Sequence, residues 1–342
     1  MPMQDSPTCQ PPLISFVVPV FDVPACWLEA CIRSIQALPV APSMREIVVV
    51  DDGSRIPVAP QLSAFGEDVR CVRTPNRGLS QARNEGLSLA RGLYIQFVDA
   101  DDSLLPRPYA CCLQTLQTVR PDIVCFRLTR SLPQEAAPVS LPPLPASLPT
   151  GTDYMVRHNL RASACGYLFR RDILGDLRFP ARLLHEDEYF TPRLFLQART
   201  VCALPVAAYY YRPHPHSITS EVSAPHVARR LDSKQHILEA LSQLAGTLPA
   251  PAREALGRRT AQLAMDVMLD MLQLPLTAAD FRLRVERMRR HGLYPLPLRR
   301  YTFPYLLFAC LTRWKITANM LFWASKTGII RRKCTKIVKM CT

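Results

Sequence analysis

Strand-like and helix-like segments alternate along the first 127 of the 342 residues of this chain. Short apolar runs, several of them β-branched, predict strands at 13–18, 47–50, 69–72, 94–98 and 123–126. Apolar residues at helical spacing predict helices near 24–38, at 80–91 and after Pro108. Because two parallel strands need a crossover connection, usually a helix, this alternation predicts an α/β fold with a doubly wound, mostly parallel sheet flanked by helices.

The second half of the chain is organised differently. Six prolines between residues 129 and 150 predict an extended loop, because proline is incompatible with the interior of a helix or central strand. Beyond this loop the patterns predict strands at 165–170 and 207–211 and a helix at 186–198. From residue 226 onward only helices are expected, at 226–245, 251–273, 277–291 and 304–325. We therefore expect an α/β domain over 1–220, with the proline-rich loop inside it, and an α-helical C-terminal region over 221–342.

The net charge of +14 is concentrated near the C-terminal end. Residues 1–110 hold nine basic and twelve acidic residues, whereas residues 281–342 hold fifteen basic residues and one acidic residue. A strongly basic chain is a candidate nucleic-acid-binding protein. The sequence contains no recognised nucleic-acid-binding motif, however, and its candidate ligand-binding edge is acidic. No nucleic-acid partner is therefore expected.

The cysteines and apolar runs indicate a cellular compartment. The 12 cysteines include no C-x-x-C pair, which favours reduced core thiols over a zinc site or a disulfide framework. The first apolar run lacks the basic flank of a secretory signal, and no run approaches the roughly 18 residues of a membrane-spanning helix. The sequence therefore predicts a cytoplasmic protein.

Two acidic clusters directly follow predicted strands. The segment Asp51-Asp52-Gly53-Ser54 ends the second strand, and Asp99-Ala100-Asp101-Asp102 ends the fourth. Ligands of doubly wound sheets bind beyond the carboxyl ends of the strands, where both clusters are expected. Three crowded carboxylates repel one another and attract a cation, and hard oxygen ligands suit Mg²⁺ or Mn²⁺. The alternatives are a solvated acidic turn for the later cluster and a plain Asp-Gly turn for the earlier one.

Further carboxylates are candidates for binding and catalysis. Asp51 and Asp52 could accept hydrogen bonds from a nucleobase or from ribose hydroxyls. A third acidic segment, His185-Glu186-Asp187-Glu188, begins a predicted helix, where acidic residues are favourable for capping alone. Glu186 or Asp187 could instead be a general base. Motifs of the common NTPases, dinucleotide-binding enzymes, zinc proteases and serine hydrolases are absent from the sequence.

The combined pattern resembles the family 2 glycosyltransferases with the GT-A fold, particularly bacterial enzymes of capsule, exopolysaccharide and lipopolysaccharide assembly. The matching motifs follow the family's order between residues 13 and 220: 14–21, 49–54, 76–86, 97–102, 185–190 and 210–212. One departure from the family pattern is Asp22, where the family usually has asparagine.

The resemblance implies a role for each matching residue. Nucleobase contacts would come from Pro19, Phe21 and Asp52, contacts to the donor phosphates from Arg83 and Arg212, and ribose and metal contacts from Asp99 and Asp101. Asp102 would be a neighbouring or alternative metal ligand, and Asp187 would be the catalytic base. The implied metal is Mg²⁺ or Mn²⁺.

The implied reaction is an inverting transfer of a sugar from a nucleoside-diphosphate sugar, expected to be UDP-linked. The acceptor would be a hydroxyl of a growing glycan or of a lipid-linked sugar. Nucleotidyl transfer to a sugar phosphate is the alternative, since a metal–nucleotide cleft serves both reactions. Against that alternative, the sequence lacks a lysine-bearing, glycine-rich phosphate loop near the first strand.

The C-terminal end mixes aromatic, aliphatic and basic residues from Arg299 onward. A helix with an apolar stripe and a polybasic end suits the surface of an anionic membrane. The sequence thus predicts a protein that is peripheral on the inner face of the cell membrane. The alternative is that the apolar stripe packs on the protein itself and the charges are merely solvated.

Overall fold

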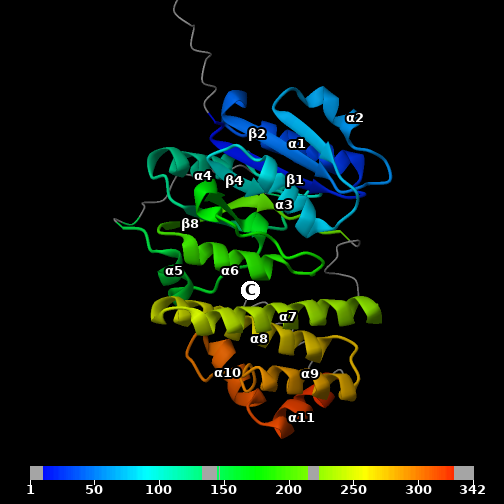
Figure 1. Ribbon diagram of the computed structural model, residues 1–342, viewed down its shortest axis with the longest axis vertical. Helices are drawn as coiled ribbons and strands as arrows, with labels where there is room; N and C mark the ends of the chain where they lie inside the picture. Colours follow the sequence, from blue (N-terminus) through cyan, green and yellow to red (C-terminus); the bar gives the residue numbers. More distant parts are fainter. Residues whose placement is uncertain (1–10, 133–144, 146, 215–222, 327–342) are drawn as a thin grey trace, which may run out of the picture. The chain divides into compact units, whose positions relative to one another are not determined.

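A computed structural model describes residues 11–132, 145, 147–214 and 223–326 (Figure 1). Most of the proline-rich loop and the polybasic end beyond residue 326 lie outside the described residues. The chain divides into two compact units. The first unit comprises 1–150, 163–182 and 197–213, and the second comprises 151–162, 183–196 and 214–342. This grouping joins two helices before residue 220 to the C-terminal helices, and the predicted domain boundary at 220 stays a prediction.

The first unit is built on one eight-stranded sheet in the order β3-β2-β1-β4-β7-β6-β8-β5. The strands are β1 (Ile14–Val20), β2 (Arg45–Asp51), β3 (Val69–Arg73), β4 (Tyr94–Phe97), β5 (Ser103–Leu104), β6 (Ile123–Thr129), β7 (Tyr167–Arg170) and β8 (Val201–Tyr210). Strands β1 to β4 pair in parallel, as does β6 with β8, while β7 is antiparallel to both of its neighbours and β5 is antiparallel to β8. The α/β fold with a mostly parallel sheet is confirmed.

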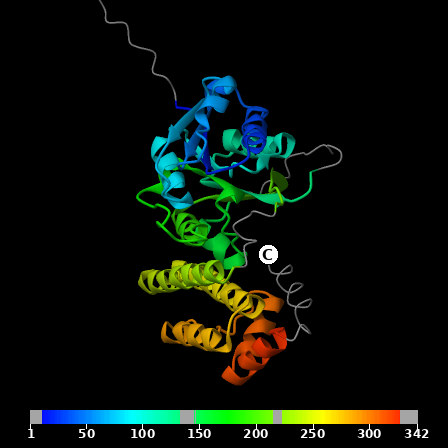
Figure 2. The same ribbon diagram turned by 90° about the vertical axis from the view of Figure 1, so that its right-hand side faces the viewer.

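The helices of the first unit cover the sheet (Figures 1 and 2). They are α1 (Ala25–Gln36), the short α2 (Ala59–Leu62), α3 (Leu79–Leu89) and α4 (Pro106–Thr118). Every residue of β1 and β2 is buried, as expected for parallel strands covered on both faces. Helix α3 packs on β1 and β2, and α4 packs on β6 and β8. Gly86 allows the approach of α3, because a side chain there would collide with Val17 of β1.

The second unit is helical. Its members are α5 (Gly151–Arg157), most of α6 (Asp187–Gln197), α7 (Ala224–Thr247), α8 (Ala250–Gln273), α9 (Ala278–Arg290), α10 (Phe303–Thr312) and α11 (Lys315–Lys326). Helices α7 and α8 lie side by side, with α5 and α6 against one side of this pair and α9 to α11 against the other (Figures 1 and 2). None of the helices in the described part of the chain is long and apolar enough to cross a membrane.

The prediction of a single helix at 304–325 is wrong, because the chain forms two helices there. Helix α10 ends at Thr312, and α11 begins at Lys315. Buried Phe322 of α11 stacks on Phe281 of α9, with ring centroids 4.6 Å apart. Both α10 and α11 also pack on α8. The break therefore lets two short helices pack on the unit where one straight helix was expected.

Candidate active site

The carboxyl ends of β1, β2 and β4 meet at one edge of the sheet. Parallel pairing sets Val20 beside Asp51, and Val17 beside Phe97. Both acidic clusters, at 51–54 and 99–102, therefore lie at this same edge.

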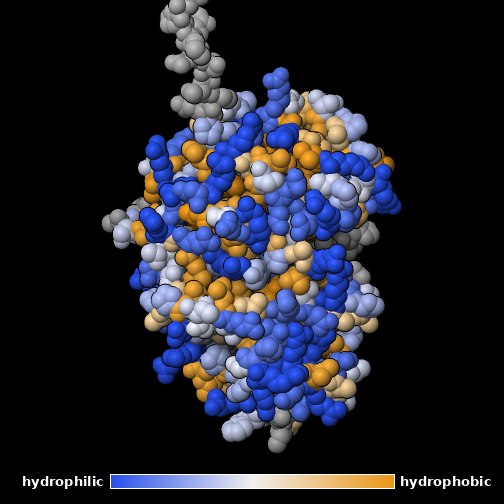
Figure 3. Space-filling view, in the orientation of Figure 1, coloured by the Kyte–Doolittle hydropathy of each residue, from blue (hydrophilic) through white to orange (hydrophobic). Residues whose placement is uncertain are grey.

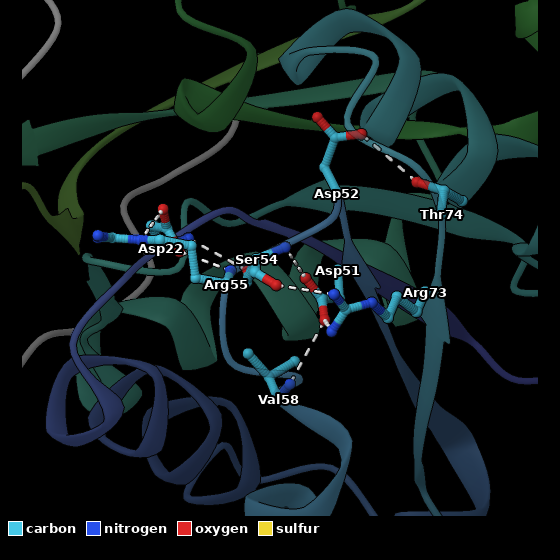
Figure 4. Close-up of polar contacts among 8 residues, drawn as sticks. All are labelled: Asp22, Asp51, Asp52, Ser54, Arg55, Val58, Arg73 and Thr74. Atoms are coloured by element: carbon cyan, nitrogen blue, oxygen red, sulfur yellow. Dashed lines mark hydrogen bonds and ion pairs between the residues drawn. The ribbon is translucent and has the colours of Figure 1, made fainter.

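Asp51 is enclosed by its own loop rather than open to a ligand (Figure 4). Its side chain is buried, and its Oδ1 accepts a hydrogen bond from the Ser54 N–H at 2.8 Å. Its Oδ2 accepts from the Val58 N–H at 3.4 Å and pairs with Arg73 Nη1 at 3.3 Å. Asp51 thus shapes the turn after β2 and ties it to β3.

Asp52 holds a second loop. Its Oδ1 accepts from the Arg77 N–H at 2.9 Å and its Oδ2 from the Gly78 N–H at 2.7 Å, just before α3 begins. Gly53 has a φ of +77°, and a Cβ there would lie 2.7 Å from the Asn76 nitrogen. The loop from β3 to α3 is therefore held closely against Asp52 and Gly53.

Asp22 closes the other side of this region (Figure 4). Its φ of +50° is a conformation that aspartate and asparagine tolerate better than most residues. The Asp22 N–H donates to Ser54 Oγ at 3.1 Å, and its carboxylate accepts from the N–H and Nε of Arg55, each at 2.9 Å. The neighbouring Phe21 is 49% exposed, whereas Pro19 is buried. An asparagine at 22 could not form the ion pair with Arg55.

Arg83 is a buried cation that orients Asp99. Its Nη2 lies 2.9 Å from Asp99 Oδ1, and its guanidinium lies over the rings of Phe97 and Phe179 at 5.8 and 5.5 Å. The Asp99 side chain is 35% exposed, so it is partly open to solvent. Arg83, which is predicted to contact the donor phosphates, therefore already forms an ion pair with Asp99.

Asp102 faces away from solvent toward the end of β8. Its Oδ2 accepts from the Tyr209 hydroxyl at 2.7 Å, and its Oδ1 from the Arg212 N–H at 2.8 Å. Burial, with the nearby charges of Asp99 and Asp101, raises the pKa of Asp102 to about 8, although both hydrogen bonds act to lower it. Asp102 therefore joins the acidic cluster to the β8 strand.

Arg212 lies beside the same cluster. Its Nε donates to the Asp101 carbonyl oxygen at 2.8 Å, and its guanidinium lies 5.6 Å from the ring centroids of both Trp27 and Tyr210. The predicted residues Arg83, Asp99, Asp101, Asp102 and Arg212 are thus brought together in the first unit.

The carboxylates of residues 99–102 fit a metal site only in part. In the described ranges, no three His, Cys, Asp or Glu side chains are grouped as metal ligands. Both oxygens of Asp102 already accept hydrogen bonds, while Asp99 and Asp101 are partly exposed. Since Mg²⁺ commonly binds one or two carboxylates together with substrate phosphates, Asp99 and Asp101 fit such a site, and Asp102 stays the alternative ligand.

The candidate base lies in the second unit. Asp187 is the first residue of α6 and is half-buried, whereas Glu186 is 5% exposed. Asp187 Oδ1 accepts from the Glu188 N–H at 3.0 Å. Of the two carboxylates, Asp187 is the more accessible to a substrate hydroxyl.

Arg259 of α8 is a residue that the sequence patterns missed. It is 6% exposed and pairs with Glu188, and its charge lies close enough to Asp187 and Asp266 to interact with both. Burial lowers its pKa, while the two aspartates act to raise it. No local signal marked Arg259, because it belongs to an ordinary helical pattern far along the chain.

His185, two residues before the candidate base, has a positive φ and a lowered pKa. Its φ is +60°, and burial, with the positive charges of Lys234 and Arg230, lowers its pKa to about 3. The imidazole is therefore neutral at physiological pH.

The sequence of the chain is similar to those of known proteins. Residues 15–177 match the sequence model of glycosyl transferase family 2. The chain is 30% identical over 228 residues to the uncharacterized glycosyltransferase EpsJ of Bacillus subtilis, covering 61% of this chain and 63% of the relative. It is 26% identical over 221 residues to the putative glycosyltransferase EpsH of the same organism, covering 60% of this chain and 62% of that relative. The chain thus spans less than two thirds of the length of these relatives.

Solved structures share the fold. The S. aureus TarS fragment 1–349 in complex with UDP aligns with a TM-score of 0.63 at 15% identity, covering 92% of this chain and 91% of that one. The mannosyltransferase PcManGT of Pyrobaculum calidifontis, in complex with GDP-Man and Mn²⁺, aligns with a TM-score of 0.52 at 15% identity, covering 97% and 91%. The expected GT-A architecture with additional C-terminal helices is therefore confirmed.

Proposed function

Since residues 15–177 match the sequence model of glycosyl transferase family 2, we propose that the chain transfers a sugar from a nucleoside-diphosphate sugar to an acceptor hydroxyl. The observation that carries this proposal is the acidic edge at which β1, β2 and β4 end, with Arg83 and Arg212 beside it. The structural relative in complex with UDP supports a UDP-linked donor.

The residues of the first unit would bind the donor. Exposed Phe21 offers a flat apolar surface for a nucleobase, and the loop held by Asp52 follows β3 at the same edge of the sheet. Asp99 and Asp101 would hold Mg²⁺ or Mn²⁺, as the relative that binds Mn²⁺ suggests. When bound, the metal neutralises charge on the donor diphosphate. Arg212, which touches the Asp101 backbone, would stabilise the same negative charge.

Asp187 would act as the general base. Its carboxylate takes the proton of the acceptor hydroxyl while that oxygen forms a bond to the anomeric carbon of the sugar. The bond from this carbon to the diphosphate breaks on the opposite face, so the nucleoside diphosphate leaves with its electron pair. A single displacement of this kind inverts the anomeric configuration.

The proposed acceptor is a growing glycan or a lipid-linked sugar. The polysaccharide-forming relatives support this class: a segment of 117 residues is 32% identical to the hyaluronan synthase of Pasteurella multocida, covering 33% of this chain and 12% of that one. We also propose that the basic C-terminal region binds the inner face of an anionic membrane, where a lipid-linked acceptor would be presented.

Release of nucleoside diphosphate tests the proposed reaction. The full chain is incubated with a panel of nucleotide sugars and Mn²⁺, with and without EDTA. Asp187→Asn keeps the size of the side chain but removes the proton acceptor, so turnover should fall by about 10² or more with little change in donor binding. Asp172→Asn, at an exposed carboxylate, is the matched control and should retain wild-type turnover.

Three results would contradict parts of this proposal. Full turnover in EDTA would exclude the metal role of Asp99 and Asp101. Loss of turnover in Glu186→Gln but not in Asp187→Asn would move the base to Glu186. Release of pyrophosphate from a nucleoside triphosphate and a sugar phosphate would indicate nucleotidyl transfer instead.

A further inference from the structure

Helix α10 is apolar on both its inner and its outer face. None of its residues, Phe303–Thr312, is charged. The inner face is formed by buried residues: Tyr305, Phe308, Ala309 and Thr312. The outer face carries Phe303, Leu307 and Leu311, which are 78%, 43% and 46% exposed. Their spacing of four residues places them in one row, and helices that are apolar all round are normally covered.

The next helix extends this outer row. Trp314, directly after α10, is 67% exposed, and Met320 and Trp323 of α11 are 64% and 60% exposed. Buried Ala318 and Phe322 form the inner face of α11. Helices α10 and α11 contact each other and both pack on α8, so these outer residues lie on two adjoining helices of the second unit. We call the six exposed residues the apolar face: Phe303, Leu307, Leu311, Trp314, Met320 and Trp323.

The segment that carries the apolar face holds positive charge. Residues 299–326 include five basic residues and no acidic residue. Arg299, Arg300 and Arg313 among them are exposed. Figure 3 shows apolar side chains reaching the surface in the region of α10, beside a strongly hydrophilic area over α9. An apolar surface whose own segment carries only cations is complementary to a layer that is apolar inside and anionic at its surface.

We infer that the apolar face is the surface with which the second unit enters an anionic lipid bilayer, with α10 and α11 lying in the plane of the interface. This inference rests on the proposed membrane association and assigns it to folded helices rather than to the polybasic end alone. Tryptophan is favoured at the membrane–water interface, and arginine binds anionic headgroups while its stem lies along apolar groups. Neither helix is long enough to cross a bilayer, so binding is peripheral and reversible.

Sedimentation of the full chain with vesicles tests the inference. The double variant Leu307→Ser, Leu311→Ser should bind phosphatidylcholine–phosphatidylglycerol vesicles about tenfold more weakly, because two leucines no longer enter the lipid. Leu93→Ser is the matched control, since Leu93 is 48% exposed in the first unit, and it should bind like the wild type. Arg299→Gln should weaken binding about fivefold, and only when the vesicles contain phosphatidylglycerol. All four substituted positions are exposed, so circular dichroism should confirm folded proteins.

Tryptophan quenching gives an independent readout. In a Trp27→Phe background the remaining tryptophans, Trp314 and Trp323, both belong to the apolar face. Lipids brominated on their acyl chains should quench their fluorescence, and the double variant should show much less quenching.

The outcomes separate the inference from the association on which it rests. The double variant could bind vesicles as well as the wild type, with no quenching by brominated lipid. That result would overturn the role of the apolar face but leave membrane binding by the polybasic end. Failure of the wild type to bind any vesicle would overturn both. A wild-type dimer that the double variant converts to monomers, with vesicle binding unchanged, would assign the face to a second copy of the chain and would also overturn the inference.

Discussion

Replacement of Asp52 by alanine separates two possible roles of this carboxylate, contact with a nucleobase and support of a loop. Asp52 is only 3% exposed, and its two oxygens accept the N–H groups of Arg77 and Gly78 at 2.9 and 2.7 Å. The structure therefore favours loop support. Asp52→Ala would leave both N–H groups without this acceptor, next to the start of α3.

The size of the effect follows mainly from these two bonds, since the third, from the Thr74 hydroxyl, is long at 3.4 Å (Figure 4). A hydrogen bond to a charged acceptor contributes about 1.5–3 kcal/mol to stability. Arg77 is exposed and Gly78 is half-buried, so water can replace part of what is lost. We therefore expect Asp52→Ala to lower the free energy of unfolding of the first unit by about 2–4 kcal/mol. Asp52→Asn keeps one acceptor oxygen and should lose roughly half as much.

Urea unfolding followed by Trp27 fluorescence measures this change. Trp27 lies in the first unit, and the substitutions Trp314→Phe and Trp323→Phe remove the exposed tryptophans of the second. Binding of UDP is measured on the same proteins at a urea concentration of zero. If Asp52→Ala unfolds within about 0.5 kcal/mol of the wild type yet no longer binds UDP, the carboxylate contacts the ligand and the loop-support argument is refuted.

Three further predictions concern packing, pH and the candidate base. Gly86→Ala should destabilise the first unit by about 1–3 kcal/mol, because the added Cβ would collide with β1. Gly257→Ala in α8 should stabilise the second unit by about 1 kcal/mol, because the space around Gly257 is open. Thermal unfolding of both variants measures these changes. The folded-state pKa of His185 is lowered to about 3, so its contribution to stability is present above the unfolded pKa of about 6.5 and is lost as the pH falls toward 3. Relative to a His185→Gln variant, the unfolding free energy of the wild type should therefore fall between pH 7 and 5, and a difference that stays constant over this range would contradict this. Arg259→Met should lower turnover more than donor affinity, because it leaves half-buried Glu188 without its cation next to Asp187. Unchanged turnover in a folded variant would exclude a positioning role.

The sequence by itself determined the α/β fold and the place of the acidic edge. Alternating apolar runs and helical patterns fix the order of strands and helices, because each pattern reports which face of a local segment is buried. Parallel pairing then brings the ends of β2 and β4 to one edge, so Asp51 and Asp99 could be located without coordinates. The roles proposed for the site residues rest on the order of the motifs and their resemblance to the family.

Only the tertiary structure decided which oxygen atoms of these carboxylates are already engaged. The bonds of Asp52 to Gly78, of Asp102 to Tyr209 and of Glu188 to Arg259 join residues 26, 107 and 71 positions apart. No local pattern encodes such pairs, because they depend on how separate elements pack. The break between α10 and α11 has the same origin: the local pattern predicts one helix across it, and packing on α8 and α9 determines which residues turn inward and which remain exposed.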